Sequence, residues 1–209
     1  MPDDSHERTT WAEGELLCGL DEAGAGNLAG SCFLSAVIFP SGFNFELLPK
    51  LNDSKKLSDK RRFELEHLIA KYALWHNTAE ISHQEIDSNS VYHAKLAAAR
   101  NMMCGSCPMV SDITVIFDGN VCVADLPHSM NSKCLIKGDG KCYTIAAASI
   151  LAKCSQRRQM LQMDKSYPEY DFKNNSGYFS DKHAEAIRKY GPTPIHRLKY
   201  IRNILRIIN

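Results

Sequence analysis

The sequence predicts an α/β protein in which a mixed sheet carries helices on both faces. Short apolar runs typical of buried strands alternate along the chain with longer stretches of helical periodicity. With 209 residues, the chain is long enough to bury one sizeable core. Its 44% hydrophobic and 23% charged residues are typical of a soluble globular protein.

The stretch from residue 16 to residue 30 organises the chain. An apolar run that predicts a buried strand ends at two adjacent carboxylates, Asp21 and Glu22, and a glycine-rich turn follows. Two acidic groups at the edge of a core are costly unless a cation compensates them, and hard divalent cations such as Mg²⁺ and Mn²⁺ prefer carboxylate oxygens. The glycines allow backbone N–H groups to approach a phosphate or a sugar.

Two plainer interpretations of this stretch stay open. Asp21 and Glu22 can cap a strand at the surface, and residues 24–26 can form an ordinary turn. A dinucleotide site is excluded, although residues 24–29 fit the pattern G-x-G-x-x-A. That motif must open a helix, whereas the next run, residues 31–39, is strand-like, and the two acids would repel a pyrophosphate.

Strands and helices alternate after this first strand. Periodicity and capping residues predict strands over residues 31–39, 73–82, 113–117 and 132–136, and helices over residues 58–72, 86–103, 142–164, 180–190 and 195–208. The first part of the helix over residues 142–164 is apolar on nearly all sides, so we expect it to be buried. Residues 1–14 are polar and are predicted to be a flexible tail.

Composition excludes several classes of protein. No run of about twenty apolar residues occurs, and the N-terminus lacks a signal-peptide core, so we expect no membrane span. The net charge is +1, but much of the Lys and Arg follows residue 133, which allows a basic face. Eight irregularly spaced cysteines favour reduced thiols in the cytoplasm. Cys104 and Cys107 form a C-x-x-C pair without the second pair that a zinc site needs.

A second carboxylate, Asp118, ends the predicted strand over residues 113–117 in front of a turn. An Asp-Gly pair after one strand is more often a turn than a ligand. Together with the Lys-Gly-Asp run at residues 137–139 and the buried helix, however, it suggests a carboxylate cage. Hydrolysis of phosphodiesters with two metal ions needs such a cage, because the cations lie about 4 Å apart.

Seven blocks of the sequence resemble ribonuclease HII, the type 2 ribonuclease H family. They are residues 19–24 (GLDEAG), 53–57 (DSKKL), 118–119 (DG), 137–139 (KGD), 145–153 (IAAASILAK), 177–178 (GY) and 190–196 (YGPTPIH), in that family's order. The resemblance implies a ribonuclease H-like mixed β-sheet flanked by helices. We therefore expect a tail over residues 1–14, a catalytic domain over residues 15–165, and a C-terminal helical extension over residues 166–209 packed on the same domain.

The resemblance also implies a reaction and its partners. It implies endonucleolytic cleavage of RNA paired to DNA, and of single ribonucleotides in duplex DNA, with Mg²⁺ or Mn²⁺. This activity removes ribonucleotides during DNA replication and repair. The expected partners are RNA–DNA hybrid and ribonucleotide-containing duplex DNA, and we expect a monomer without membrane contact.

Individual residues take roles from the same resemblance. Asp21, Glu22 and Asp118 match the family's catalytic, metal-binding carboxylates. Tyr178 matches the tyrosine that stacks on the sugar beside the ribonucleotide. The glycine turn matches the backbone that senses the ribose 2′-OH, the group that separates RNA from DNA. The remaining expected substrate contacts are Gly24, Ala25, Gly26, Lys55, Lys56, Lys137 and Lys153.

The chain departs from the family pattern at three notable positions. Ala25 and Asn27 stand where the family usually has Arg and Pro. Arg157 stands where the pattern places an Asp that serves as the fourth active-site carboxylate. Helical spacing puts Arg157 on one stripe with Ile150 and Cys154, which predicts that it starts from the inward face. In the alternative, its stem alone is buried and its head reaches solvent.

Two hypotheses follow from these departures. The chain is either a metal-dependent ribonuclease HII or a catalytically impaired relative that binds RNA–DNA hybrid without efficient cleavage. If Arg157 lies near Asp21 and Asp118, it takes the place of a second cation, and we expect a weakened second metal site. Clustered carboxylates repel one another, so at least one pKa should be raised in the absence of metal.

Overall fold

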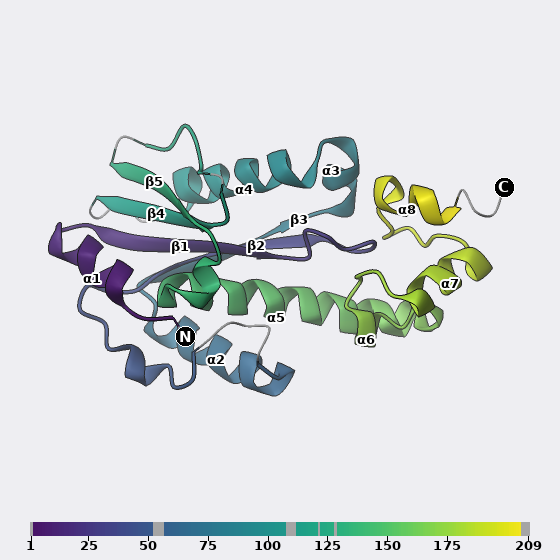
Figure 1. Ribbon diagram of the computed structural model, residues 1–209, viewed down its shortest axis with the longest axis horizontal. Coiled ribbons are helices and arrows are strands. Elements are labelled where there is room, and N and C mark those ends of the chain that lie inside the picture. The colour runs from purple at the N-terminus through teal and green to yellow at the C-terminus, as the bar shows by residue number, and fades with distance from the viewer. Residues whose placement is uncertain (1, 52–56, 108–111, 121, 128, 206–209) are drawn as a thin grey trace.

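A mixed five-stranded sheet forms the middle layer of the chain (Figure 1). The computed structural model describes residues 2–51, 57–107, 112–120, 122–127 and 129–205. In the order β3-β2-β1-β4-β5 the strands are Trp75–Ile81, Cys32–Ile38, Leu16–Ala23, Ile113–Asp118 and Met130–Leu135. The strand β1 pairs antiparallel with β2 and parallel with β4. The predicted mixed sheet is therefore confirmed.

One face of the sheet is covered by α2 (Asp59–Tyr72) and α5 (Tyr143–Ser166) (Figure 1). The helix α5 runs close along β1, because a Cβ placed at Gly19 would lie 2.6 Å from the backbone nitrogen of Ile145. Only a glycine allows this approach. The first two turns of α5 are buried, as predicted, and their contact with β1 positions the candidate site.

The opposite face is covered by α3 (His83–Ser88) and α4 (Val91–Gly105) (Figure 1). The sequence predicts a single helix over residues 86–103, and this is wrong. The side chains of Ser82 and Ser90 each accept a backbone N–H and cap a separate helix. A second N-cap within the run ends the first helix and starts another.

The C-terminal extension packs on the far end of α5. It contains the 3-10 turn η4 (Pro168–Tyr170) and the helices α6 (Phe172–Asn175), α7 (Asp181–Tyr190) and α8 (Leu198–Leu205). Its small core consists of Leu28, Ala29, Met160, Tyr170, Phe172, Ala184, Ala186, Ile187, Ile201 and Ile204. Because two of these residues belong to the β1–β2 connection, the extension holds the segment that follows Glu22.

The N-terminal residues are ordered against α5, which corrects the prediction of a flexible tail over residues 1–14. They form α1 (Ser5–Ala12), and the side chain of Glu7 is fully buried. Its Oε1 accepts the backbone N–H of Thr144 at 2.7 Å and the Thr144 hydroxyl at 2.8 Å. A carboxylate at the start of a helix satisfies N–H groups that lack a partner within the helix. Across the described ranges, no helix combines the length and apolar character required to cross a lipid bilayer.

Candidate active site

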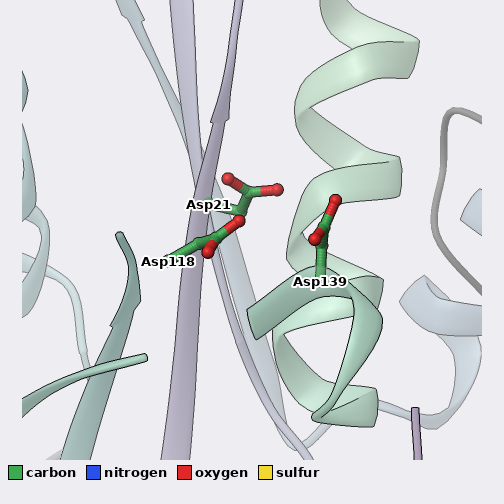
Figure 2. A group of neighbouring side chains, drawn as sticks. All are labelled: Asp21, Asp118 and Asp139. Carbon is green, nitrogen blue, oxygen red and sulfur yellow. The ribbon is translucent and has the colours of Figure 1, made fainter. Parts of the chain in front are cut away.

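Three aspartates from separate elements meet at one end of the sheet. Asp21 lies in β1, Asp118 ends β4, and Asp139 belongs to the 3-10 turn η3 (Gly138–Gly140) in front of α5. One carboxylate oxygen from each lies within 4.8 Å of the other two. Figure 2 shows the three side chains gathered beside the ribbons of β1 and α5. The predicted convergence of Asp21 and Asp118 is confirmed.

Strand register explains how these aspartates come together. The strands β1 and β4 are parallel neighbours that pair Leu20 with Phe117. The next residues, Asp21 and Asp118, therefore lie side by side near the carboxyl end of the sheet, where α/β folds place their ligands. The backbone N–H of Gly138 donates to Oδ1 of Asp118 at 2.8 Å, which ties β4 to the turn that carries Asp139.

The aspartate cluster concentrates negative charge in a buried place. Asp21 is only 6% exposed. Burial, together with the charges of Asp118 and Glu22, raises its pKa from 3.8 to about 7, against the opposing effects of Ser149 and Lys153. At least one raised pKa was predicted, and it is confirmed. Three carboxylates gathered in this way fit a hard divalent cation, which takes oxygen ligands.

Glu22 points away from this cluster. Side chains alternate between the faces of a strand, so Asp21 turns toward α5 while Glu22 turns toward α4. There, Oε1 of Glu22 lies 2.6 Å from Nζ of Lys95. Within the described residues, the group of carboxylates that share one metal's reach contains Asp139 in the place expected for Glu22.

The glycine turn after β1 is held by a buried arginine of the C-terminal extension. The guanidinium of Arg197 is fully buried. It donates to the carbonyl oxygens of Gly24 at 2.8 Å, Ala25 at 2.9 Å and Gly30 at 2.9 Å. Gly24 has a φ of +85°, and a Cβ there would lie 2.9 Å from the carbonyl oxygen of Ser31. The turn therefore requires a glycine and is fixed by charge-assisted hydrogen bonds.

The departure from the family pattern at Asn27 has a structural use. Asn27 is fully buried, and its Nδ2 donates to the carbonyl of Ser176 at 2.9 Å. The side chain of Gln156 donates to the same carbonyl at 3.3 Å. These bonds connect the glycine turn and α5 to the loop that carries Tyr178.

Tyr178 stands beside the glycine turn. It is 43% exposed, and a Cβ at Gly26 would lie 4.0 Å from its ring. The Tyr178 carbonyl accepts from Nδ1 of His183 at 2.8 Å, and Nε2 of His183 lies 3.1 Å from Nε2 of His196. Burial lowers the pKa of both imidazoles, to about 4 for His196. Both rings are therefore neutral at pH 7 and support the backbone of Tyr178.

A basic pocket of about 520 Å³ opens next to Tyr178, between α2, α5 and α6. Its lining residues are Arg62, Lys153, Gln156, Arg157, Asn174, Asn175, Ser176 and Tyr178. Cations and amide groups on one concave surface suit the phosphates of a nucleic acid strand.

Comparison with known proteins places this geometry in a family. A family model described as Ribonuclease HII matches residues 18–203. The chain belongs to the ribonuclease HII family. It is accordingly a hydrolase of the ribonuclease H type, an endonuclease. The resemblance seen in the sequence is confirmed.

Individual relatives match this chain over most of its length. Ribonuclease HII from Chlorobium chlorochromatii is 39% identical over 197 residues, which cover 93% of this chain and 94% of that protein. The crystal structure of ribonuclease H2 from Pyrococcus horikoshii superposes with a TM-score of 0.73 at 22% identity, covering 92% of this chain and 98% of that one. Bst-RNase HIII in complex with Mn²⁺ gives a TM-score of 0.64 at 16% identity, covering 93% and 70%. The structural likeness confirms the ribonuclease H-like fold.

Arg157 starts from an inward stripe of α5 but faces α2 and not the aspartates, so the condition under which it would take the place of a second cation is not met. Its Nε lies 2.7 Å from Oδ2 of Asp59 in α2, and the side chain is 20% exposed. Its Nη1 donates to the carbonyl of Lys173 in α6. Arg157 therefore ties α5 to α2 and α6 at the rim of the basic pocket.

Two neighbouring rows of side chains on α5 explain why Arg157 does not face the aspartates. Ile150 and Cys154 pack in the core shared with α2, so the stripe that leads to Arg157 faces α2. The residues of α5 that act on the Asp21 carboxylate are Ser149 and Lys153. The stripe facing the aspartates thus lies one residue earlier, and the third carboxylate comes from the turn before the helix instead.

Sequence reasoning assigned no role in this site to three residues. Asp139 belongs to the run at residues 137–139 that supported a carboxylate cage, but it was not named as a ligand. No sequence feature marks Lys95 or Arg197 as part of the site, because each is one cation within a helical or basic stretch. Of the lysines expected at phosphates, Lys55 and Lys56 lie outside the described residues. Lys137 is exposed and Lys153 is partly buried, and their phosphate contacts stay predictions.

Proposed function

We propose that this chain is a metal-dependent endoribonuclease. It cleaves the RNA strand of RNA–DNA hybrids and single ribonucleotides embedded in duplex DNA, and so serves ribonucleotide removal in DNA replication and repair. The observation that carries the proposal is the cluster of Asp21, Asp118 and Asp139, with their oxygens within 4.8 Å of one another. Membership of the ribonuclease HII family supplies the substrate class.

Asp21, Asp118 and Asp139 are the residues that would hold Mg²⁺ or Mn²⁺. The Mn²⁺ complex of the similar Bst-RNase HIII supports a divalent cation as the cofactor. Bound here, such a cation supplies positive charge at the scissile phosphate and makes an attacking water more acidic. The bond from the N–H of Gly138 keeps Asp118 oriented toward the centre, which reduces reorganisation during the reaction.

The glycine turn and Tyr178 are proposed to select the ribonucleotide. Arg197 donates hydrogen bonds to the carbonyl oxygens of Gly24 and Ala25, and Gly26 stays exposed. The backbone at Gly26 can then approach a 2′-OH without a side chain in the way. The exposed ring of Tyr178 flanks this position and offers a stacking surface for the adjacent sugar.

The basic pocket is proposed to hold the strand that enters the site. Lys153 reaches from α5 toward both the pocket and Asp21, so a bound strand can run from the pocket to the aspartates. Phosphate contacts of this kind position the strand without reading its sequence.

A nicking assay tests the proposal. A DNA duplex with one ribonucleotide and the same duplex without it are incubated with the chain in Mg²⁺ and, separately, in Mn²⁺. We expect a single nick at the ribonucleotide, none in the all-DNA duplex, and none in EDTA. Absence of nicking in both metals, with the duplex bound, would refute the proposal.

That last outcome would favour the second hypothesis, a relative that binds hybrid without efficient cleavage. Its main support was Arg157 at the place of a catalytic carboxylate. Because Arg157 pairs with Asp59 and the third carboxylate is Asp139, this support is lost.

A further inference from the structure

Glu22 is paired with a cation that comes from the opposite layer of the fold. Nζ of Lys95 in α4 lies 2.6 Å from Oε1 of Glu22, and the two side chains are 18% and 19% exposed. The same ammonium lies 5.6 Å from the ring centroid of Phe117, the residue before Asp118. Lys95 is thus held between a carboxylate and an aromatic face, next to the aspartate cluster.

This pair differs from a second ion pair made by α4. Nη1 of Arg100 lies 3.6 Å from Oδ2 of Asp125, and the two side chains are 55% and 74% exposed. An exposed pair of this kind contributes little, because water screens it. Breaking a largely hidden pair leaves one charge without compensation. The bond between Lys95 and Glu22 therefore restrains the Glu22 carboxylate.

We propose that Lys95 is a positioning residue that competes with the divalent cation for Glu22. The inference rests on the proposed function, since it takes a metal centre at the aspartate cluster as given. Glu22 directly follows Asp21 in β1, but its carboxylate is turned toward α4. The charge of Glu22 already acts on the Asp21 carboxyl, so the Glu22 carboxylate lies within electrostatic reach of the cluster. For Glu22 to serve the cation, it must first leave Lys95, and this requirement weakens binding of the metal.

The competition between Lys95 and the metal can be measured as a change in the dissociation constant for Mn²⁺. Two partners that compete for one group lower each other's affinity by the same factor. Lys95→Met keeps the length of the side chain and its contact with Phe117 but removes the ammonium. We expect the dissociation constant for Mn²⁺ to fall by about 5- to 150-fold, the usual range for coupling between two binding events.

The experiment is a calorimetric titration of the metal-free protein with MnCl₂ in the absence of nucleic acid. Lys95→Met is compared with the wild type and with Arg100→Met, which removes a cation of the same helix that does not touch Glu22. Lys95→Gln is a second neutral variant in case the first does not fold, and thermal unfolding without metal checks each protein. Lys95→Arg keeps the charge and should keep the wild-type affinity.

A double variant identifies the group that is released. Adding Glu22→Gln to Lys95→Met should return the Mn²⁺ affinity to the wild-type value or below. Equal affinities for the wild type and the neutral variants would overturn the proposal. A gain of the same size in Arg100→Met, or a double variant that keeps the whole gain, would overturn it as well.

The outcome is separable from that of the nicking assay. A chain that nicks at the ribonucleotide but shows no gain in Mn²⁺ affinity in the neutral variants refutes the role of Lys95 alone. A chain that shows the gain but does not nick refutes the proposed function alone.

Discussion

The aspartate cluster and the glycine turn are neighbours along the chain, but their buried polar groups are compensated in opposite ways. In the cluster, burial and like charges raise the pKa of Asp21 to about 7. In the turn, the guanidinium of Arg197 donates to three carbonyl oxygens at 2.8 to 2.9 Å. One region gathers like negative charges, and the other has an internal cation that matches its acceptors.

The difference shows which part of the site the chain completes by itself. The turn is held in position by the C-terminal extension and needs nothing from solution to keep its shape. Under the proposed function, a divalent cation from solution offsets the carboxylates of the cluster. Removal of metal should therefore disturb the cluster and leave the turn, whereas changes in the extension should do the reverse.

The largest expected effect comes from removing one carboxylate of the cluster. Asp139→Asn should lower the nicking rate by about 10²–10³-fold or more, because one stabiliser of transition-state charge is lost. Far-ultraviolet circular dichroism should stay unchanged. The matched control is Asp125→Asn, which changes an exposed carboxylate at 74% exposure and should nick at the wild-type rate. Full activity of Asp139→Asn would remove Asp139 from the site.

The second prediction tests the raised pKa of Asp21 through the pH dependence of stability. A carboxyl group whose pKa is higher in the folded state favours its protonated form there, so its ionisation destabilises the fold. For Asp21 the pKa rises from 3.8 to about 7. The penalty is absent below the lower value, grows between the two and is complete above the higher one.

Asp21→Asn removes this penalty. In EDTA, the free energy of unfolding of the variant minus that of the wild type should increase by up to about 4 kcal/mol from about pH 4 to about pH 8. Urea unfolding curves across this pH range provide the measurement, and saturating Mg²⁺ should suppress the trend. A difference that does not change with pH would show that the charge of Asp21 is already compensated.

The third prediction concerns the turn. Arg197→Met removes a donor from three carbonyl groups, of which Gly24 also accepts the N–H of Asn27 at 3.3 Å, and each group left unsatisfied costs about 1–3 kcal/mol. We expect the free energy of unfolding to fall by about 2 kcal/mol or more, and discrimination between ribonucleotide-containing and all-DNA duplex to weaken. Arg202→Met, an exposed arginine of α8, is the control. Unaltered discrimination in a folded Arg197→Met variant would separate the turn from substrate selection.

The smallest expected effect on the nicking rate is that of Arg157→Asp. Arg157 pairs with Asp59, and the two side chains are 20% and 37% exposed, so the variant loses a partly buried pair and places a second carboxylate beside Asp59, which should lower the free energy of unfolding. Because the side chain does not face the aspartates, the nicking rate in Mg²⁺ should not rise. A clear increase in rate would mean that position 157 acts on the metal centre after all.

Local sequence chemistry determined much of this protein. Apolar periodicity located the strands and most helices, and the acids at the ends of β1 and β4 predicted where charge would gather. Such features can be predicted because strand ends and caps depend on neighbouring residues. The seven blocks that match the family also identified it, because they occur in the family's order and span nearly the whole chain.

Only the tertiary structure decided which side chains meet. Asp21 and Glu22 are adjacent in sequence, but their side chains turn in different directions: Asp21 meets Asp139 from the turn before α5, and Glu22 meets Lys95 from α4. Arg157 and Lys153 lie on neighbouring stripes of α5, and a rotation of one residue decides which stripe faces the cluster. Arg197 reaches the glycine turn from more than 160 residues away. Contacts of this kind depend on how layers pack, which the periodicity of a single element does not specify.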